Sequence, residues 1–349
     1  MLETSEAGLY CAAGGFWVDP WVPVDCAVIT HAHSDHARWG SRSYLCASAG
    51  EALLRARLQP GSAIQSADYG ETLTLGGVRV SLHPAGHILG SAQVRVEYGG
   101  EVWVVSGDYK LEPDPTCAPF ESVRCHTFVS ESTFGLPIFR WPGQQAVLDQ
   151  VVDWWRANQE AGKASILFAY PLGKAQRVLA GIDGSLGPIF THGAVEHVNR
   201  IYRESGVALA PAQALASAPP GTELSQALIL APPSSHATPW MRRFPRASTA
   251  FASGWMRIRG TRRRRSLDRG FVLSDHADWP GLLRAIGESG AENVWVTHGY
   301  RAPLVRWLQE HGCNALAVET PFEGEPADST GDAAAVDEGG TSAAGEAPS

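Results

Sequence analysis

The stretch His31-Ala32-His33-Ser34-Asp35-His36 decides the fold, because it places three imidazoles and a carboxylate within six residues. The preceding run, residues 24–30, is apolar and rich in β-branched side chains, which predicts a buried strand that ends where the histidines begin. Imidazole nitrogens and carboxylate oxygens are the ligands that zinc and similar divalent ions prefer. We therefore expect His31 and His33 to bind one ion and Asp35 and His36 a second, as in two-metal hydrolases.

A His-rich surface loop is the alternative interpretation of this stretch, and the rest of the chain disfavours it. Polar side chains follow apolar, strand-like runs at several further points: Asp19, His87, Asp108, Glu131, His276 and His298. A sheet that delivers such residues at one edge forms a shared cleft. The sequence thus predicts one composite site.

Length and composition set further limits. The 349 residues suffice for two domains, or for one domain with an insertion, and an apolar share of 44% supports a real core. The chain has no run of about 18 apolar residues and no N-terminal signal pattern, so we expect a cytoplasmic protein without a membrane partner. The six cysteines form no Cys-x-x-Cys pair, which favours buried thiols over disulfides or metal ligands.

Residues 137–264 differ from the rest of the chain in their predicted secondary structure, because strand-like and helix-like segments alternate there. The expected helices cover residues 144–161, 173–182 and 196–205, and the expected strands cover 165–170, 188–191, 227–231 and 248–252. Such alternation predicts a parallel sheet with helices on its faces. We therefore expect residues 1–136 and 265–321 to form one α/β domain that residues 137–264 interrupt.

The motif His-x-His-x-Asp-His after a strand resembles the signature of the metallo-β-lactamase fold. The acid Glu131 and the histidines at positions 276 and 298 match three motifs of the β-CASP nucleases. Over about residues 8–320 the chain is similar to the bacterial ligase-associated DNA exonucleases within that group. The resemblance implies an αββα sandwich with an inserted α/β cap. It also implies an ATP-dependent DNA ligase and a helicase as partners.

The resemblance also implies a ligand set. His87 is preferred over His83, because the family's ligand histidine precedes a Gly-Ser-Ala stretch. Asp19, with Asp25 as a weaker competitor, is expected to orient a ligand histidine from behind. The expected ligands are His31, His33 and His87 for one ion, Asp35, His36 and His298 for the other, and Asp108 as the bridge. Zinc suits the histidines, and manganese in an octahedral site would also support turnover.

The chemistry that this implies is metal-assisted hydrolysis of a phosphodiester, with Asp35 and Asp108 counted among the catalytic residues. His276, held by Glu131, is expected to protonate the leaving oxygen. The first expectation is a DNA exonuclease that works from the 5′ end of single strands in repair or end processing. The alternative is an RNA nuclease of the mRNA 3′-end processing type, since Artemis-like DNA nucleases generally lack a histidine that corresponds to His298.

Two other classes are disfavoured. The inserted domain and Glu131 argue against a small-molecule metallo-hydrolase. The complete ligand set argues against a nucleic-acid-binding protein without activity.

Cationic residues of the inserted segment are candidates for contact with nucleic acid. Gly173-Lys174 lacks the spacing of a phosphate-binding loop, so we do not expect an ATPase, although Lys174 begins a helix that would face a phosphate. Trp240 and Trp255 would either stack on bases or join the core. The expected contacts are Lys174, Arg257, Arg259, Arg262, Arg263 and Arg264.

The net charge of −8 is concentrated in residues 322–349, which hold seven acidic side chains and no Lys or Arg. This segment consists largely of Gly, Ala, Ser, Pro and acids, so it has little to bury. We expect a disordered acidic tail that solvates the protein rather than mimicking its substrate.

Overall fold

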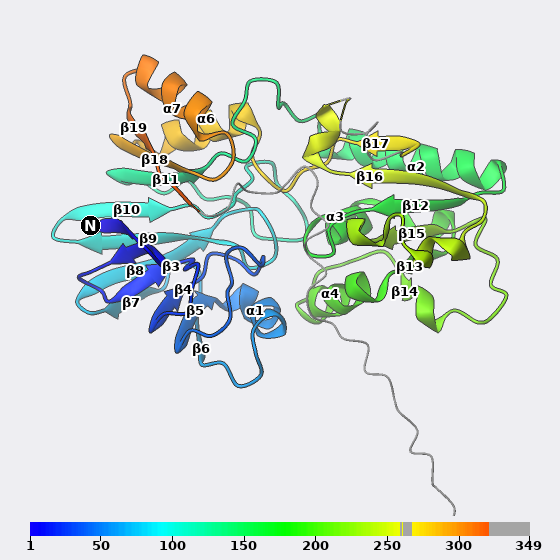
Figure 1. Cartoon of the computed structure of the whole chain (residues 1–349), viewed down its shortest axis with the longest axis horizontal. Coiled ribbons are helices and arrows are strands. Elements are labelled where there is room, and N and C mark those ends of the chain that lie inside the picture. The colour runs from blue at the N-terminus through cyan, green and yellow to red at the C-terminus, as the bar shows by residue number, and fades with distance from the viewer. Residues whose placement is uncertain (259, 261–266, 321–349) are drawn as a thin grey trace, which may run out of the picture.

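The computed structural model describes residues 1–258, 260 and 267–320. The predicted acidic tail and the arginines at 259 and 262–264 lie outside the described residues. The described chain forms a core lobe, built from its first and last parts, and a cap lobe beside it (Figure 1).

The first sheet of the core follows chain order. Its first three strands are antiparallel, and the last four run parallel to one another. The run before the histidine-rich stretch contributes a short strand to it, as predicted. The strands are β1 (Leu2–Ser5), β2 (Gly8–Cys11), β3 (Phe16–Val18), β4 (Cys26–Val28), β5 (Ser43–Ala47) and β6 (Ile64–Ala67).

The second sheet combines an antiparallel meander with a parallel edge. The order is β19-β18-β11-β10-β9-β8-β7, and the strands from β10 to β19 are parallel neighbours. The hairpin formed by Thr72–Leu75 and Val78–Pro84 turns at Gly76 and Gly77, whose positive φ angles of 55° and 88° suit glycine. The strands are β7 (Thr72–Leu75), β8 (Val78–Pro84), β9 (Ala92–Tyr98), β10 (Glu101–Val105), β11 (Thr127–Glu131), β18 (Asn293–Thr297) and β19 (Asn314–Ala317).

The two sheets pack face to face, and their alternating apolar side chains form one core. Val18 and Val28 from the first sheet share a cluster with Val80 and Val94 from the second. Helix α1 (Glu51–Arg57) covers the outer face of the first sheet. Helices α6 (Trp279–Ser289) and α7 (Arg301–Glu310) cover the outer face of the second. The layers of this α/β domain therefore run helix, sheet, sheet, helix.

The cap is inserted between two neighbouring strands, because β11 and β18 pair in parallel although residues 132–292 separate them. Its sheet is parallel throughout, in the order β14-β13-β15-β12-β16-β17. The strands are β12 (Ala164–Phe168), β13 (Ile189–Thr191), β14 (Gln213–Ala214), β15 (Leu228–Ala231), β16 (Ala247–Ala252) and β17 (Arg269–Phe271), and the helices are α2 (Gln144–Glu160), α3 (Lys174–Gly181) and α4 (Gly193–Glu204).

The predicted end of the cap at residue 264 is too early. Strand β17 pairs in parallel with β16 and so belongs to the cap sheet. Phe271 at its end packs against Trp154 of α2, with 5.7 Å between the ring centroids. Burial of the apolar Phe271 ring in the cap core thus places this strand in the cap, although His276 of the core site follows it closely in sequence.

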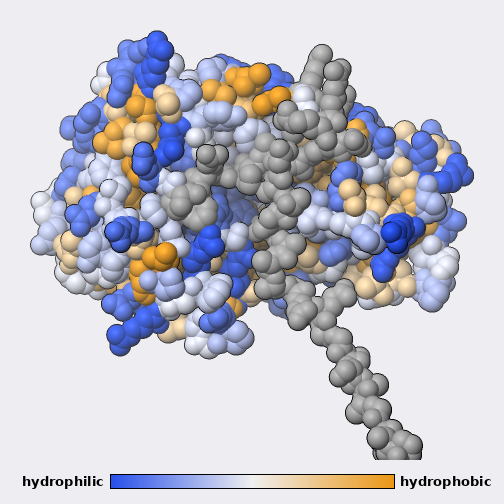
Figure 2. Space-filling model, viewed as in Figure 1, coloured by the Kyte–Doolittle hydropathy of each residue, from blue (hydrophilic) through white to orange (hydrophobic). Residues whose placement is uncertain are grey.

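Hydrophilic residues cover much of the outer surface of both lobes on the face in Figure 2, with apolar residues in small groups. Within the described chain, the longest and most apolar helices fall short of what a membrane span requires.

Candidate active site

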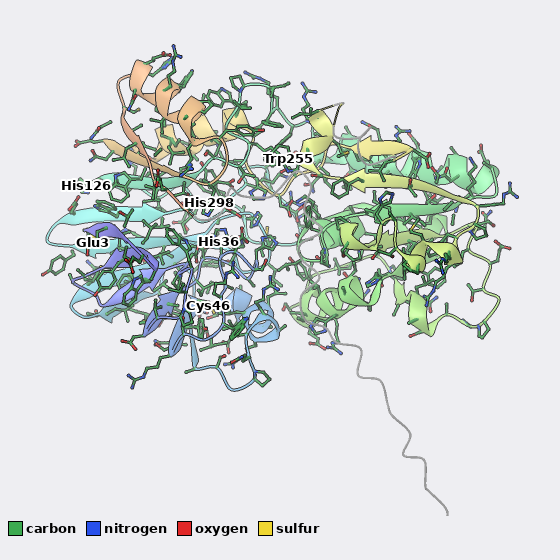
Figure 3. The ribbon with its side chains drawn as sticks, viewed as in Figure 1. Glu3, His36, Cys46, His126, Trp255 and His298 are labelled. Atoms are coloured by element: carbon green, nitrogen blue, oxygen red, sulfur yellow. The ribbon has the colours of Figure 1, made fainter. Side chains whose placement is uncertain are left out.

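Strand ends of both core sheets deliver polar side chains to the side of the core that faces the cap. Asp19 follows β3, and the histidine-rich stretch follows β4. Asp108 follows β10, Glu131 ends β11, and His298 follows β18. His36 and His298 lie toward the cap, whereas His126 lies at the other end of the core (Figure 3).

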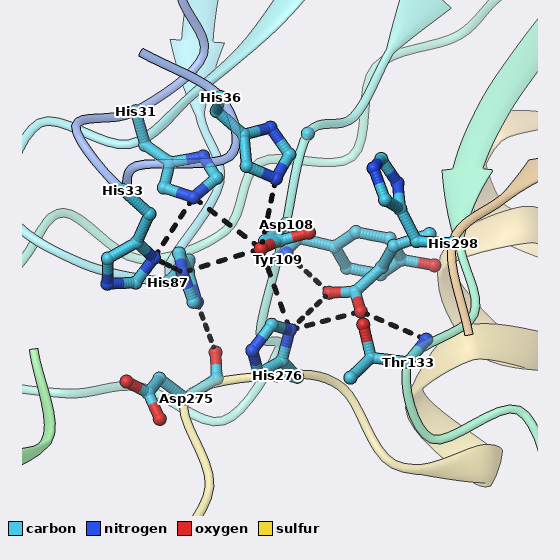
Figure 4. Close-up of polar contacts among 12 residues, drawn as sticks. His31, His33, His36, His87, Asp108, Tyr109, Thr133, Asp275, His276 and His298 are labelled. Atoms are coloured by element: carbon cyan, nitrogen blue, oxygen red, sulfur yellow. Dashed lines mark hydrogen bonds and ion pairs between the residues drawn. The ribbon is translucent and has the colours of Figure 1, made fainter. Parts of the chain in front are cut away.

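Four of the predicted ligands converge on one point (Figure 4). The Nε2 atoms of His31 and His87 each lie 3.1 Å from Nδ1 of His33. Oδ2 of Asp108 lies 3.5 Å from Nε2 of His31 and 3.8 Å from Nε2 of His87. Two nitrogens on one tetrahedral zinc lie about 3.3 Å apart when each bond is near 2.0–2.1 Å. The cluster therefore has the dimensions of a metal site.

Hydrogen bonds to the outer nitrogens of His33 and His87 fix where their lone pairs point. Nε2 of His33 lies 3.3 Å from the carbonyl oxygen of Leu172, and Nδ1 of His87 lies 2.8 Å from that of Asp275. Because a carbonyl only accepts, these nitrogens must carry the protons. The lone pairs then lie on the two nitrogens that face each other, which is the state that binds a metal ion.

Asp19 fixes the tautomers of two more histidines. Its Oδ2 accepts from Nδ1 of His36 at 2.7 Å and from the hydroxyl of Thr30 at 2.6 Å. Because that hydroxyl donates to Asp19, Nδ1 of His31, 3.0 Å away, must donate to it. Asp19 has the positive φ of 45° that turns its carboxylate toward both, while Asp25 is exposed. Asp19 thus lies where a residue that orients the ligands must be.

The second group of predicted ligands adjoins the first. Nε2 of His36 lies 3.4 Å from Oδ2 of Asp108 and 3.7 Å from Oδ2 of Asp35. It is buried and has no hydrogen-bond partner in the described chain. A buried polar nitrogen without a partner costs about 1–3 kcal/mol, so the site fits a metal ion that would bind this nitrogen in place of a proton.

His298 completes this group. Its ring lies 5.3 Å from that of His36, between centroids. Its Nδ1 lies 3.1 Å from the hydroxyl of Thr297, which donates its own proton to the carbonyl of Ser130. Nδ1 of His298 must therefore donate, and the lone pair lies on Nε2. Asp108 lies between the two groups, since it contacts both His31 and His36.

Burial and charge separate the pKa values of these histidines. Burial lowers the pKa of His31 and His87 well below the usual value, and the neighbouring imidazoles reinforce this. Burial also opposes a charge on His36, yet Asp108, Asp35 and Asp19 raise its pKa well above the usual value. Burial opposes the charge on Asp108 as well, but His36 and His276 hold its pKa well below normal. The metal-free site therefore keeps His31 and His87 neutral beside an ionised Asp108, whereas His36 is charged and would release its Nε2 proton when a metal ion binds.

His276 lies beside the ligands, and Glu131 holds it. Nδ1 of His276 is 3.1 Å from both carboxylate oxygens of Glu131, and 3.9 Å from Oδ2 of Asp108. Glu131 also accepts from the backbone N–H groups of Tyr109, at 2.9 Å, and Thr133, at 3.3 Å. The carboxylate is therefore immobilised, and Nδ1 carries the proton. Nε2 of His276 is then the nitrogen that can exchange a proton.

The prediction that Lys174 contacts nucleic acid is wrong in this structure. Its side chain is only 3% exposed, and its Nζ lies 2.7 Å from Oδ1 of Asp275, which is fully buried. A buried carboxylate without a cation is costly, so the lysine neutralises it instead of facing a phosphate. Arg257 is exposed, with its Nε donating to the carbonyl of Ile138, and its contact with nucleic acid stays a prediction. Trp255 belongs to the cap core.

Sequence reasoning missed the polar network behind His87. Nε of Arg177, in α3, lies 3.0 Å from Oδ2 of Asp114. The same guanidinium donates to the carbonyls of His87 and Ser274, each at 3.1 Å. The acid next to His276 in sequence was a signal for Asp275, but no spacing pattern indicates the partner of Asp114.

Comparison with known proteins finds similarity to proteins named as a DNA ligase and as ribonucleases. No family model matches the chain. It is 32% identical over 318 residues to a probable DNA ligase of Opitutus terrae, a match that covers 89% of this chain and 30% of that protein. It is 29% identical over 125 residues to Endoribonuclease YSH1 of Gibberella zeae, covering 34% and 14%. It is 24% identical over 209 residues to an RNase J-like protein of Methanocaldococcus jannaschii, covering 51% and 50%.

The chain thus spans half or less of each of these relatives. Among solved structures, a protein of unknown function from Enterococcus faecalis V583 is similar, with a TM-score of 0.54 and 11% identity over 78% of this chain and 74% of that one. This likeness concerns the fold alone. The fold and the histidine–aspartate cluster define an α/β protein with a candidate metal site. The relatives above accord with the resemblance of the chain's motifs to the metallo-β-lactamase and β-CASP nucleases.

Proposed function

We propose that this chain is a two-metal phosphodiesterase that acts as a DNA exonuclease, directed to the 5′ ends of single strands in repair or end processing. One observation carries the proposal. Three imidazoles and Asp108 come within reach of one ion, and His36, Asp35 and His298 adjoin them, at the junction of the core with an inserted cap.

In this proposal one ion is held by His31, His33 and His87, and a second by Asp35, His36 and His298, with Asp108 shared between them. Zinc matches the nitrogen-rich donors, and manganese is the other candidate. Bound there, the ions would supply a water of lowered pKa and positive charge against the phosphoryl oxygens. Asp19 and Thr30 keep His31 and His36 in the tautomers that can bind a metal ion.

His276 supplies the acid in this mechanism. Both carboxylate oxygens of Glu131 accept from Nδ1 of His276, which fixes the ring and leaves Nε2 as the nitrogen that exchanges a proton. A proton on Nε2 can pass to the departing oxygen of the cleaved strand. Phe134, whose ring lies 5.9 Å from that of His276, packs beside it.

The relatives bear on the substrate in two ways. The match that covers 89% of this chain is with a protein named as a probable DNA ligase, which favours DNA as the substrate and a DNA ligase as a partner. A helicase partner is implied by the family resemblance alone. The relatives named endoribonuclease and RNase J-like favour RNA instead. An RNA nuclease is therefore the second candidate, and His298 is the residue that favours it.

Matched oligonucleotides of one sequence, as single-stranded DNA and as RNA, test the proposal when each carries a label at one end. With added Mn²⁺ or Zn²⁺ we expect the DNA to be shortened from its 5′ end while the RNA is spared. Cleavage of RNA alone would establish the second candidate. Wild-type protein that binds metal and cuts neither polymer would overturn both. Asp108→Ala is the control that distinguishes this activity from a contaminating nuclease.

A further inference from the structure

A cavity of about 400 Å³ adjoins the candidate metal site at the junction of core and cap. Its core wall comes from α1 and from Ala32, which lies between two predicted ligands. Its cap wall comes from α4 and the segments that follow β12 and β15. Leu172 lines the cavity, and its carbonyl oxygen accepts from His33 at 3.3 Å. A ligand in the cavity would therefore be an immediate neighbour of the first metal position.

The walls of the cavity suit a flat, aromatic ligand. Apolar side chains of both lobes line it, among them Leu53, Val198 and Ile201. Trp240 adds an aromatic wall that is only partly buried. Its ring contacts that of Phe244, with 4.9 Å between centroids, which steadies its plane. Nucleobases stack on such side chains irrespective of sequence, because every base has a π-face.

The polar groups of the cavity suit the edge of a base and the backbone attached to it. Ser234 and Thr238 offer hydroxyls, and Arg57 and His192 lie among the lining residues. Nδ1 of His192 accepts from the backbone N–H of Ala194 at 3.1 Å, so its Nε2 carries the proton. The described lining contains no Asp or Glu. A polyanion therefore meets no like charge there, and Arg57 supplies one of opposite sign.

We propose that this cavity binds the nucleobase of a nucleotide adjacent to the cleaved bond, with Trp240 as the stacking surface. The inference rests on the proposed function, because it assigns a subsite to the same substrate strand. The volume of the cavity lies within the range of about 300–1,000 Å³ that small-molecule sites span. The cavity thus fixes how far the strand advances toward the metals, while the backbone occupies the metal site itself.

Removal of single bases tests this without altering the protein. Dye-labelled oligodeoxythymidylate, with one abasic residue placed at each position in turn, is bound to wild-type protein in EDTA and followed by fluorescence anisotropy. We expect one position at which loss of the base weakens binding about five- to hundredfold, as loss of one stacking contact does. Equal binding at every abasic position would overturn the inference.

The variant Trp240→Ala identifies the surface responsible. We expect it to bind the intact oligonucleotide more weakly and to lose the sensitivity to that one abasic position, with Trp240→Phe restoring part of both. The control Tyr98→Ala removes a ring that is 51% exposed at the β9–β10 turn, on the side of the core away from the cap. It should behave as wild type. Unchanged abasic sensitivity in Trp240→Ala would show that the base binds elsewhere.

Failure of the inference and failure of the proposed function give different results. Metal-dependent cleavage without a Trp240-dependent position would retain the phosphodiesterase and reject this cavity as its subsite. A Trp240-dependent position without cleavage under any metal would retain the subsite and reject the phosphodiesterase. Circular dichroism of each variant excludes misfolding as the cause. Should Trp240→Ala not fold, Trp240→Phe and the abasic series on wild type still decide.

Discussion

Asp19 lies behind two of the predicted metal ligands, His31 and His36. Its carboxylate accepts a hydrogen bond from Nδ1 of His36 and another from the hydroxyl of Thr30, which in turn accepts from Nδ1 of His31. Both imidazoles are thereby turned so that their lone pairs face Asp108. At the scale of single residues, the geometry of the site depends on which nitrogen of each histidine is protonated, and backbone carbonyls, threonines and Asp19 decide this.

Asp19→Asn should therefore weaken metal binding. The amide offers one neutral acceptor where the carboxylate serves three donors, so the tautomer of His36 loses its support. We expect a fall of about 10- to 100-fold in metal affinity, as for other residues that orient ligands. Titration against a chromophoric chelator measures it. Asp25→Asn, at an exposed position nearby, is the matched control, and equal affinity of both variants would contradict this role of Asp19.

His276→Ala should retain metal and lose turnover. The alanine removes the proposed proton donor but none of the predicted metal ligands, and general acids contribute about 10²- to 10⁴-fold to rate. We expect kcat to fall by about that factor, with KM and metal content little changed, and Glu131→Gln to show part of the effect. Metal content by atomic emission and steady-state rates test this. Loss of metal in His276→Ala would show that His276 is a ligand.

Helix α3 is the element that connects the cap to the site. Its Lys174 and Arg177 are both buried, and they neutralise Asp275 and Asp114. Arg177 also binds the carbonyl of His87, and the carbonyl of Asp275 accepts from the ring of that same histidine. The position of one predicted ligand is therefore set by a cap helix, through contacts between residues far apart in sequence.

Arg177→Met should destabilise the whole protein strongly. It would leave Asp114 buried without its cation, which costs about 3–5 kcal/mol in free energy of unfolding. Urea unfolding of Arg177→Met and wild type measures the difference. Arg306→Met is the control, because the Arg306–Glu310 pair has an arginine side chain that is 81% exposed and contributes about 0–1 kcal/mol. Similar decreases in the free energy of unfolding of both variants would show that the buried Arg177–Asp114 pair stabilises the protein no more than an exposed pair does.

The same pair predicts how stability depends on pH. Burial opposes the charge on Asp114, but Arg177, Thr116 and Gln144 lower its pKa below the usual value. A carboxyl with a depressed pKa in the folded state stabilises the protein above its unfolded pKa of about 3.9. That contribution is lost as the pH falls through the folded pKa. Asp114→Asn should therefore lose less stability than wild type between neutral pH and about pH 3. Urea unfolding at a series of pH values measures the free energy of unfolding of both proteins. The same pH dependence in wild type and Asp114→Asn would contradict this prediction.

How far the sequence predicted this architecture depends on the range of the interaction. Strand-end residues such as Asp108 and His298 were found because an acid or a histidine after an apolar run is a local pattern. The helices and strands of the cap were found because their periodicity is local too. Lys174 was misassigned, and Arg177 was missed, because their partners depend on tertiary packing. Strand β17 was assigned to the wrong lobe for the same reason, since the packing of Phe271 on α2 is not visible in its own run.

At the scale of the whole molecule, the insertion between β11 and β18 gives the site its setting. Glu131 ends one of these strands and His298 follows the other, so the chain leaves for the cap and returns beside the predicted ligands. The cap then supplies Leu172 behind His33, Arg177 behind His87 and the far wall of the cavity. Core and cap together thus form one candidate site for a strand of nucleic acid.

The dependence of turnover on bound metal shows whether the chain uses a two-metal mechanism. Protein stripped with a chelator is reconstituted with Zn²⁺ or Mn²⁺, and cleavage of single-stranded DNA is followed alongside metal content. We expect no cleavage without metal, full turnover at two ions per chain, and no turnover in Asp108→Ala at any metal concentration, as that mechanism requires. Cleavage by metal-free protein, or undiminished cleavage by Asp108→Ala, would contradict it.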